Sequence, residues 1–126
     1  MIDLGATSIW EQYLPTEKGA EHYAMYGKKY GRSLCHAWGG GPIYLLGRFA
    51  AGVYPTDVAY KTFTVEPKRE IYKNFDATVP LPDGNTITVH LDAHTCRVKA
   101  TRCGGTLIMG GKKYKIDPSR EFTLSF

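Results

Sequence analysis

The sequence predicts an α+β chain in which a short helical segment is followed by an antiparallel β-sandwich. Two observations carry this prediction. The hydrophobic periodicity changes near residues 54–56, from a helical spacing before them to an alternation of apolar and polar residues after them. Signals for tight turns then recur about every ten residues. With 126 residues, the chain suits one domain or a small domain with a flanking segment.

The first half is predicted to contain one clear helix and one weaker helix. Glycines at 39–41 interrupt the helical spacing, because each glycine weakens a helix by about 1 kcal/mol. Pro42 fits the first turn of a new helix, which we expect to end near Ala51. The irregular turn before it carries His36 and Trp38. The weaker helix is expected over 20–28, where Ala, Met and Tyr dominate.

The second half is predicted to form strands joined by tight turns. Alternate apolar residues occupy one face of five segments: 61–65, 87–91, 96–100, 114–116 and 122–126. Turn signals stand between the strands, at 82–85 (PDGN), 92–95 (DAHT), 103–105 (CGG) and 110–111 (GG). Short strands at this spacing are typical of a β-sandwich, and we expect about seven or eight of them.

The composition excludes several classes of partner. The net charge is +4, but the basic residues form separate pairs, such as 28–29 and 112–113, and not the stripe that follows a phosphate backbone. We therefore expect no nucleic-acid partner. No apolar run approaches the roughly 18 residues of a membrane span, so we expect no membrane partner. No signal peptide is visible after Asp3, and we expect a soluble chain whose compartment is left open.

The cysteines and most histidines do not suggest a metal site. Cys35, Cys96 and Cys103 have no ligand-like spacing, and their odd number argues against a complete disulfide framework. We interpret them as small buried residues, and we expect no metal and no cofactor. The histidines outside the glycine-rich turn are interpreted as surface or hydrogen-bonding residues: His22, His90 and His94.

Two chemical candidates stand in the first half. Glu11 directly follows Trp10, and an apolar neighbour can raise the pKa of a carboxyl group. The plainer interpretation is an acidic residue near a helix start, where the helix dipole favours it. His36 and Trp38 lie in the glycine-rich turn, where a loop histidine beside an aromatic ring is a binding candidate. A structural, hydrogen-bonded histidine is the alternative.

Three stretches, taken in order, resemble the C-terminal end of bacterial α-L-rhamnosidases: MIDLGATSIWEQY (1–13), SLCHAWGGGPIYLLGRFAAGVYPT (33–56), and YKTFTVEP with ATVPLPDGNTITV (60–67 and 77–89). The resemblance weakens after about Val98. In this family the catalytic domain is an (α/α)6 barrel, followed by a small β-sandwich. The resemblance therefore implies that residues 1–52 are the tail of the barrel and that residues 53–126 are the sandwich domain.

The resemblance also implies a function. It makes Glu11, the glutamate of the GAT-x-WE motif, the general base of an inverting glycosidase that removes terminal α-L-rhamnose from glycans. His36 becomes a substrate contact, and Trp38 a platform for the apolar face of the sugar. The general acid of the family lies upstream of the GAT-x-WE segment, in a region that this sequence does not contain. We therefore expect the chain alone to be inactive, with a rhamnose-containing glycan and the rest of the barrel as partners.

Two further expectations concern interactions. A helical segment without its barrel would expose apolar residues such as Trp10, Leu45 and Phe49, which predicts a homodimer. The rival function is a free-standing carbohydrate-binding or structural β-sandwich module. A carbohydrate-binding module is expected to place aromatic rings on one open sheet face, drawn from Tyr60, Tyr72 and Tyr114.

Overall fold

The computed structural model describes residues 1–126 apart from the side chain of Asp83. The chain divides into two compact units, which are Met1–Tyr44, the N-terminal unit, and Leu45–Phe126, the sandwich unit. Every strand that belongs to a sheet in the described chain lies in the sandwich unit. The N-terminal unit consists mainly of short turns and irregular segments.

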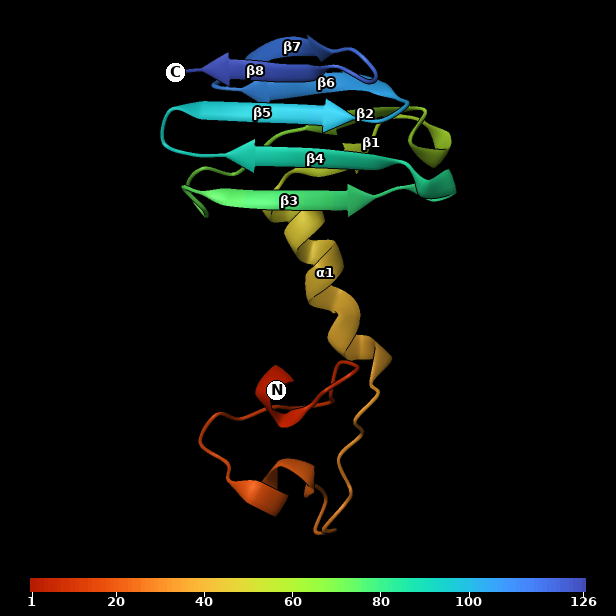
Figure 1. Ribbon diagram of the computed structural model, residues 1–126, viewed down its shortest axis with the longest axis vertical. Helices are drawn as coiled ribbons and strands as arrows, with labels where there is room; N and C mark the ends of the chain where they lie inside the picture. The colour runs from red at the N-terminus through yellow and green to blue at the C-terminus, as the bar shows by residue number, and fades with distance from the viewer. The chain divides into compact units, whose positions relative to one another are not determined.

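Eight strands of the described chain form two four-stranded sheets (Figure 1). One sheet has the order β1-β2-β6-β7, with bounds Val53–Pro55, Thr62–Val65, Gly104–Met109 and Lys112–Ile116. The other has the order β3-β4-β5-β8, with bounds Phe75–Pro80, Thr86–Leu91, Thr95–Ala100 and Glu121–Ser125. Neighbouring strands are antiparallel, except that β2 and β6 run parallel. The predicted α+β chain with a β-sandwich is confirmed.

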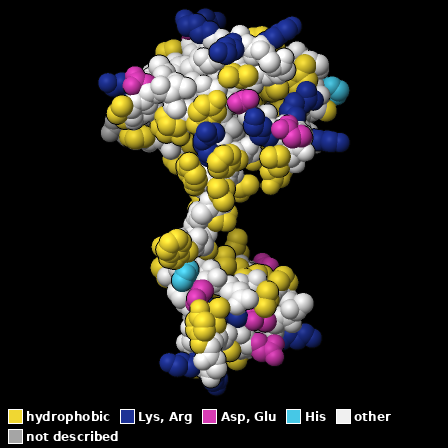
Figure 2. Space-filling view, turned by 180° about the vertical axis from the view of Figure 1, so that it is seen from behind, with side chains coloured by type: hydrophobic (Ala, Val, Ile, Leu, Met, Phe, Trp, Pro, Cys, Tyr) yellow, Lys and Arg dark blue, Asp and Glu magenta, His cyan; other side chains and the backbone are white. Residues whose placement is uncertain are grey.

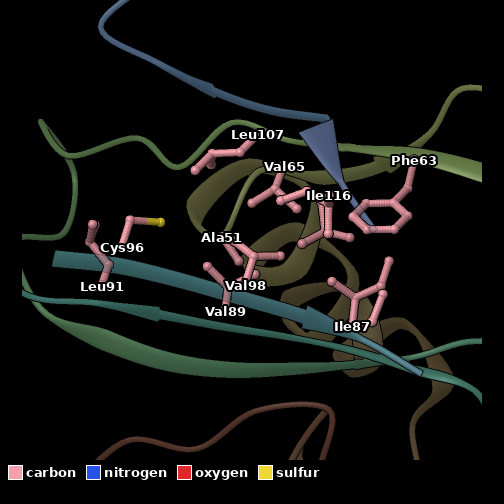
Figure 3. Close-up of a cluster of buried hydrophobic side chains, with 12 residues drawn as sticks. Ala51, Phe63, Val65, Ile87, Val89, Leu91, Cys96, Val98, Leu107 and Ile116 are labelled. Atoms are coloured by element: carbon pink, nitrogen blue, oxygen red, sulfur yellow. The ribbon is translucent and has the colours of Figure 1, made fainter. Parts of the chain in front are cut away.

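The core of the sandwich unit lies between the sheets and is built from the alternating apolar residues of their strands (Figure 3). On β4, Ile87, Val89 and Leu91 are fully buried, while the residues between them are half-buried. Phe63 and Leu107 face them from the other sheet. Burying one such side chain contributes about 1.5–3 kcal/mol, so this cluster is the main source of stability in the sandwich unit.

Three of the four predicted turns join neighbouring antiparallel strands. Residues 82–84 form a 3-10 turn between β3 and β4, and residues 92–94 connect β4 with β5. Gly110 and Gly111, both with positive φ, make the two-residue turn between β6 and β7. The predicted bend at 103–105 is wrong, because Gly105 lies inside β6. Its missing side chain matters there, since a Cβ would come 2.6 Å from the Phe63 carbonyl oxygen.

One helix of the described chain matches its prediction and another does not. The helix α1 spans Gly41–Leu45 and continues as a π-helical turn over Leu46–Ala50, close to the expected range. The helix expected over 20–28 is wrong, because only Gly19–Tyr23 form a 3-10 turn and the chain then reverses at a tight turn. None of the helices in the described part of the chain is long and apolar enough to cross a membrane.

Apolar side chains remain exposed along the helix, as the sequence predicts for Leu45 and Phe49. Phe49 is 50% exposed, and Leu45 and Leu46 are similarly exposed. Figure 2 shows hydrophobic side chains gathered on the sandwich unit where the helix ends. The same expectation for Trp10 is wrong, because it is only 6% exposed. Its ring packs against aromatic neighbours in the N-terminal unit.

Candidate functional site

The site in the N-terminal unit is built on two extended segments that lie side by side. The Glu11 amide donates to the Ser33 carbonyl oxygen at 2.9 Å, and the His36 amide donates to the Ile9 carbonyl oxygen at 2.8 Å. Gly39 packs against Ile9, where a Cβ would overlap the Ile9 side chain. This pairing places Glu11 beside the segment that carries His36, although 25 residues separate them in sequence.

The Glu11 carboxylate is held at both oxygens. The Tyr26 hydroxyl donates to Oε1 at 2.7 Å, and the Ser33 amide donates to Oε2 at 3.1 Å. These two donors, with a smaller contribution from the charges of His36 and Arg32, lower the pKa of Glu11 below its usual range. Glu11 is therefore ionised at neutral pH.

Two interpretations of Glu11 from the sequence are corrected by this geometry. Glu11 lies at a bend and not at the start of a helix, so a helix dipole does not explain its place. The pKa of Glu11 is lowered and not raised, because its two hydrogen bonds outweigh the upward effect of burial. The Trp10 side chain is itself buried among other rings. The Trp10 ring lies 6.4 Å from that of Tyr13 and 5.8 Å from that of Tyr23.

An ion pair between the buried Arg32 and the half-buried Glu17 stabilises the loops around Glu11. The Arg32 guanidinium donates to both Glu17 carboxylate oxygens, at 2.6 and 2.8 Å, and to the His22 carbonyl oxygen at 2.9 Å. The pair lowers the pKa of Glu17. His22 is buried and its ring stacks on Tyr13, so of the two interpretations of His22 the surface one is wrong. Its Nδ1 lies 3.5 Å from Glu17 Oε2. Sequence reasoning missed the pair of Arg32 and Glu17, since residues 15 apart on irregular segments follow no local pattern.

His36 and Trp38 differ in their surroundings. His36 is half-buried, and its carbonyl oxygen accepts a hydrogen bond from the Gly39 amide at 2.9 Å, which closes the 3-10 turn over Ala37–Gly40. Trp38 is 88% exposed on that turn. A large aromatic ring held at the surface by a turn is an available apolar plane for a ligand.

A second polar cluster lies on the sheet formed by β3, β4, β5 and β8. The His90 ring contacts the carboxylates of Asp76, at 2.6 Å, and of Asp92, at 3.1 Å, and both raise the pKa of His90. A shallow groove of about 340 Å³ runs past this cluster and is also lined by Arg97 and Glu121. Both ring nitrogens have carboxylate partners, and the contact with Asp76 joins β4 to β3.

Among the described residues, the possible metal ligands do not cluster and the cysteines differ in burial. This part of the chain contains no group of three or more His, Cys, Asp or Glu side chains that could hold a metal ion. The prediction that the cysteines are buried is correct only for Cys96, since Cys35 is exposed and Cys103 is half-buried. Burial raises the pKa of the Cys96 thiol to about 11, which makes it a packing residue.

The fold is shared with part of a known enzyme structure. The native α-L-rhamnosidase from Aspergillus terreus matches 98% of this chain with a TM-score of 0.63 and 16% sequence identity. The chain spans only 15% of the length of that protein. No protein-family model and no curated protein matches the sequence. At this identity the likeness establishes the fold alone.

Proposed function

We propose that this chain is the C-terminal part of an α-L-rhamnosidase-like inverting glycoside hydrolase, as in the bacterial enzymes that its motifs resemble, with Glu11 as the general base. The observation that carries the proposal is the Glu11 carboxylate, ionised and held at both oxygens in a half-buried position. A general base must be deprotonated and fixed in direction before it can accept a proton from water. The fold shared with part of a rhamnosidase supports the same function.

The proposed reaction uses Glu11 to activate a water molecule. The water oxygen bonds to the anomeric carbon of a terminal α-L-rhamnose while its proton passes to Glu11, and the glycosidic oxygen leaves with a proton from a general acid. An inverting enzyme needs these two carboxyl groups roughly 6.5–9.5 Å apart. Glu17, the other partly buried carboxylate near Glu11, is engaged by Arg32 and is ionised, so it is unsuited to the role of acid.

His36 and Trp38 are the proposed sugar contacts. The paired segments place His36 beside Glu11, where its charge contributes to the lowered pKa of the carboxylate. Trp38 offers an exposed ring for the apolar face of a deoxy sugar. The acid and the remaining contacts are proposed to come from the rest of a barrel, which would cover the exposed apolar side chains of the helix.

The rival proposal, a free-standing carbohydrate-binding module, is less well supported by the positions of the aromatic residues. Tyr60 lies in the 3-10 turn Val58–Tyr60, Tyr72 lies in the connection between β2 and β3, and Tyr114 lies on β7 beside Phe122. The three tyrosines therefore do not follow one strand face, as a sugar-binding platform on an open sheet requires.

Reconstitution tests the proposed function. The full chain is mixed with an α-L-rhamnosidase barrel truncated before its GAT-x-WE segment, and hydrolysis of a chromogenic α-L-rhamnoside is followed. The mixture is expected to hydrolyse the substrate with inversion, and neither part alone is expected to do so. Glu11→Gln should abolish this activity. Glu21→Gln is the matched control, because the Glu21 side chain accepts a hydrogen bond from the Lys18 amide, at 2.8 Å, and does not contact Glu11. Activity that survives Glu11→Gln would contradict the proposal.

Direct binding tests the sugar contacts without a partner. Addition of L-rhamnose to the isotopically labelled full chain is expected to shift the NMR signals of Glu11, His36 and Trp38, and Trp38→Ala should weaken the effect. Hydrolysis by the pure chain that Glu11→Gln abolishes would refute the expectation that it is inactive alone. Shifts confined to the sheet residues would instead support the binding-module alternative.

A further inference from the structure

Tyr26 and Gly27 form a tight turn in the N-terminal unit. The amides and carbonyls of Met25 and Lys28 are mutually hydrogen-bonded, at 3.0 and 2.9 Å, around these two residues. Tyr26 has a φ of 53° and Gly27 a φ of 73°. The left-handed conformation suits glycine, but it is unfavourable for a tyrosine and persists only where the surroundings enforce it.

The surroundings of the turn hold it in one place. Gly31 lies against the Met25 carbonyl group so closely that any side chain at position 31 would overlap it. The next residue, Arg32, donates its amide to the Tyr23 carbonyl oxygen at 3.0 Å, and its side chain is fixed by Glu17. The residues that follow the turn are thus anchored by the buried Arg32 to the rest of the N-terminal unit.

The anchored turn directs one atom to Glu11. Tyr26 is 75% exposed, so its ring gains little from burial. Its hydroxyl nevertheless donates to Glu11 Oε1 at 2.7 Å, across 15 residues of sequence. The two-residue turn requires a positive φ at both of its central residues, so Tyr26 is kept in a conformation that glycine, asparagine or aspartate would adopt more easily. An exposed side chain there whose hydroxyl makes one well-formed hydrogen bond to a carboxylate far away in sequence points to a role for that bond beyond local folding.

We propose that Tyr26 is the positioning residue of Glu11, which its hydroxyl holds at Oε1 while the Ser33 amide holds Oε2. This inference rests on the proposed function in treating Glu11 as the base. An ionised carboxylate has about four lone-pair sites, so two donors orient it and still leave sites for the water to be activated. The same hydrogen bond lowers the pKa of Glu11 and raises the pKa of Tyr26. Removing either group is therefore expected to shift the pKa of the other.

Carboxyl-carbon NMR of the full 126-residue chain tests this inference through the pKa of Glu11. Tyr26→Phe removes the donor and keeps the ring, and the pKa of Glu11 is expected to rise toward its usual range. Tyr30→Phe is the matched control, because Tyr30 is a similarly exposed tyrosine of the same unit whose ring contacts Tyr23 and Lys29. The control should leave the pKa of Glu11 unchanged. The inference is overturned if Tyr26→Phe leaves it unchanged as well.

A reciprocal measurement covers the case in which Tyr26→Phe does not fold. In Glu11→Gln, the pKa of Tyr26, followed by NMR of labelled tyrosine rings, should fall toward its usual value; an unaltered Tyr26 pKa would overturn the inference. The outcomes also separate this inference from the proposed function. Coupled pKa values without reconstituted hydrolysis would refute the enzyme function and retain the contact. Reconstituted hydrolysis with uncoupled pKa values would refute the positioning role alone.

Discussion

Replacing Gly39 with alanine tests the packing that brings the two site segments together. A Cβ at Gly39 would overlap Cγ2 of Ile9 and would lie 3.3 Å from the Trp10 carbonyl oxygen. Cγ2 is attached directly to the Ile9 Cβ, so it can move only if the side chain changes rotamer or the backbone shifts. The Gly39 backbone does not have a positive φ, so the expected effect is steric.

The magnitude follows from comparison with the neighbouring glycine. Overpacking at a closely packed position costs about 1–3 kcal/mol. Gly40 has no neighbouring atom within 4 Å of an added Cβ, and a glycine-to-alanine change at such a position stabilises by about 0.4–1 kcal/mol. We therefore expect the free energy of unfolding of the N-terminal unit to fall in Gly39→Ala and to be maintained or increased in Gly40→Ala. A difference of about 2 kcal/mol changes the folded-to-unfolded ratio roughly 30-fold.

Urea unfolding of the full chain, followed by tryptophan fluorescence, measures this difference. Trp10 is buried in the N-terminal unit and Trp38 is exposed, so a Trp38→Phe background makes Trp10 the reporter. Gly39→Ala should unfold at a lower urea concentration than Gly40→Ala. Equal midpoints for the two variants would refute the close approach of Gly39 to Ile9, and with it the arrangement of the site.

Three other predictions concern acid stability, thiol reactivity and assembly. Hydrogen bonds lower the pKa values of Glu11 and Glu17 in the folded chain, so their stabilisation is complete above the usual value of 4.5 and is lost as the pH falls through the lowered values. An acid titration followed by fluorescence should show this loss, and a signal constant into strong acid would contradict it. A thiol reagent should modify Cys35 rapidly and Cys96 only on unfolding, as mass spectrometry of the labelled peptides can establish; equal rates would contradict the burial of Cys96. Light scattering should give the mass of a homodimer that Phe49→Glu dissociates, and a monomeric mass for the unaltered chain would refute this prediction.

Local patterns account for most of the sandwich that the sequence predicts. The alternation at 87–91 and 96–100 is interpretable without tertiary information, because a strand with one buried face has a period of two. The glycine pair at 110–111 likewise has a local meaning as a two-residue turn. The five predicted segments do not include β1, β3 or β6. The strand β6 was missed because its leading glycines resemble a bend and its hydrophobic residues do not alternate with polar ones.

The parallel pairing of β2 with β6 shows where local patterns end. Thr62 lies opposite Gly104, so the two strands are about forty residues apart in sequence, and no turn links them directly. The glycine at position 105 is explained only by this pairing, because its backbone lies against Phe63 and leaves no room for a side chain. The alternation predicts that strands form, but the choice of neighbour depends on how both sheets bury their apolar faces together.

The sequence by itself determined the α+β chain, three of the turns that join consecutive strands, and Glu11, His36 and Trp38 as the candidate site residues. These depend on hydrophobic periodicity, turn chemistry and short motifs, which are all local. Only the tertiary structure decided that the Trp10 side chain packs against other aromatic rings and that Tyr26 and Ser33 hold the Glu11 carboxylate. Those contacts join irregular segments 15 and 22 residues apart, where no period relates one residue to another. The lowering of the Glu11 pKa therefore depends on hydrogen-bond donors that folding brings close to its carboxylate.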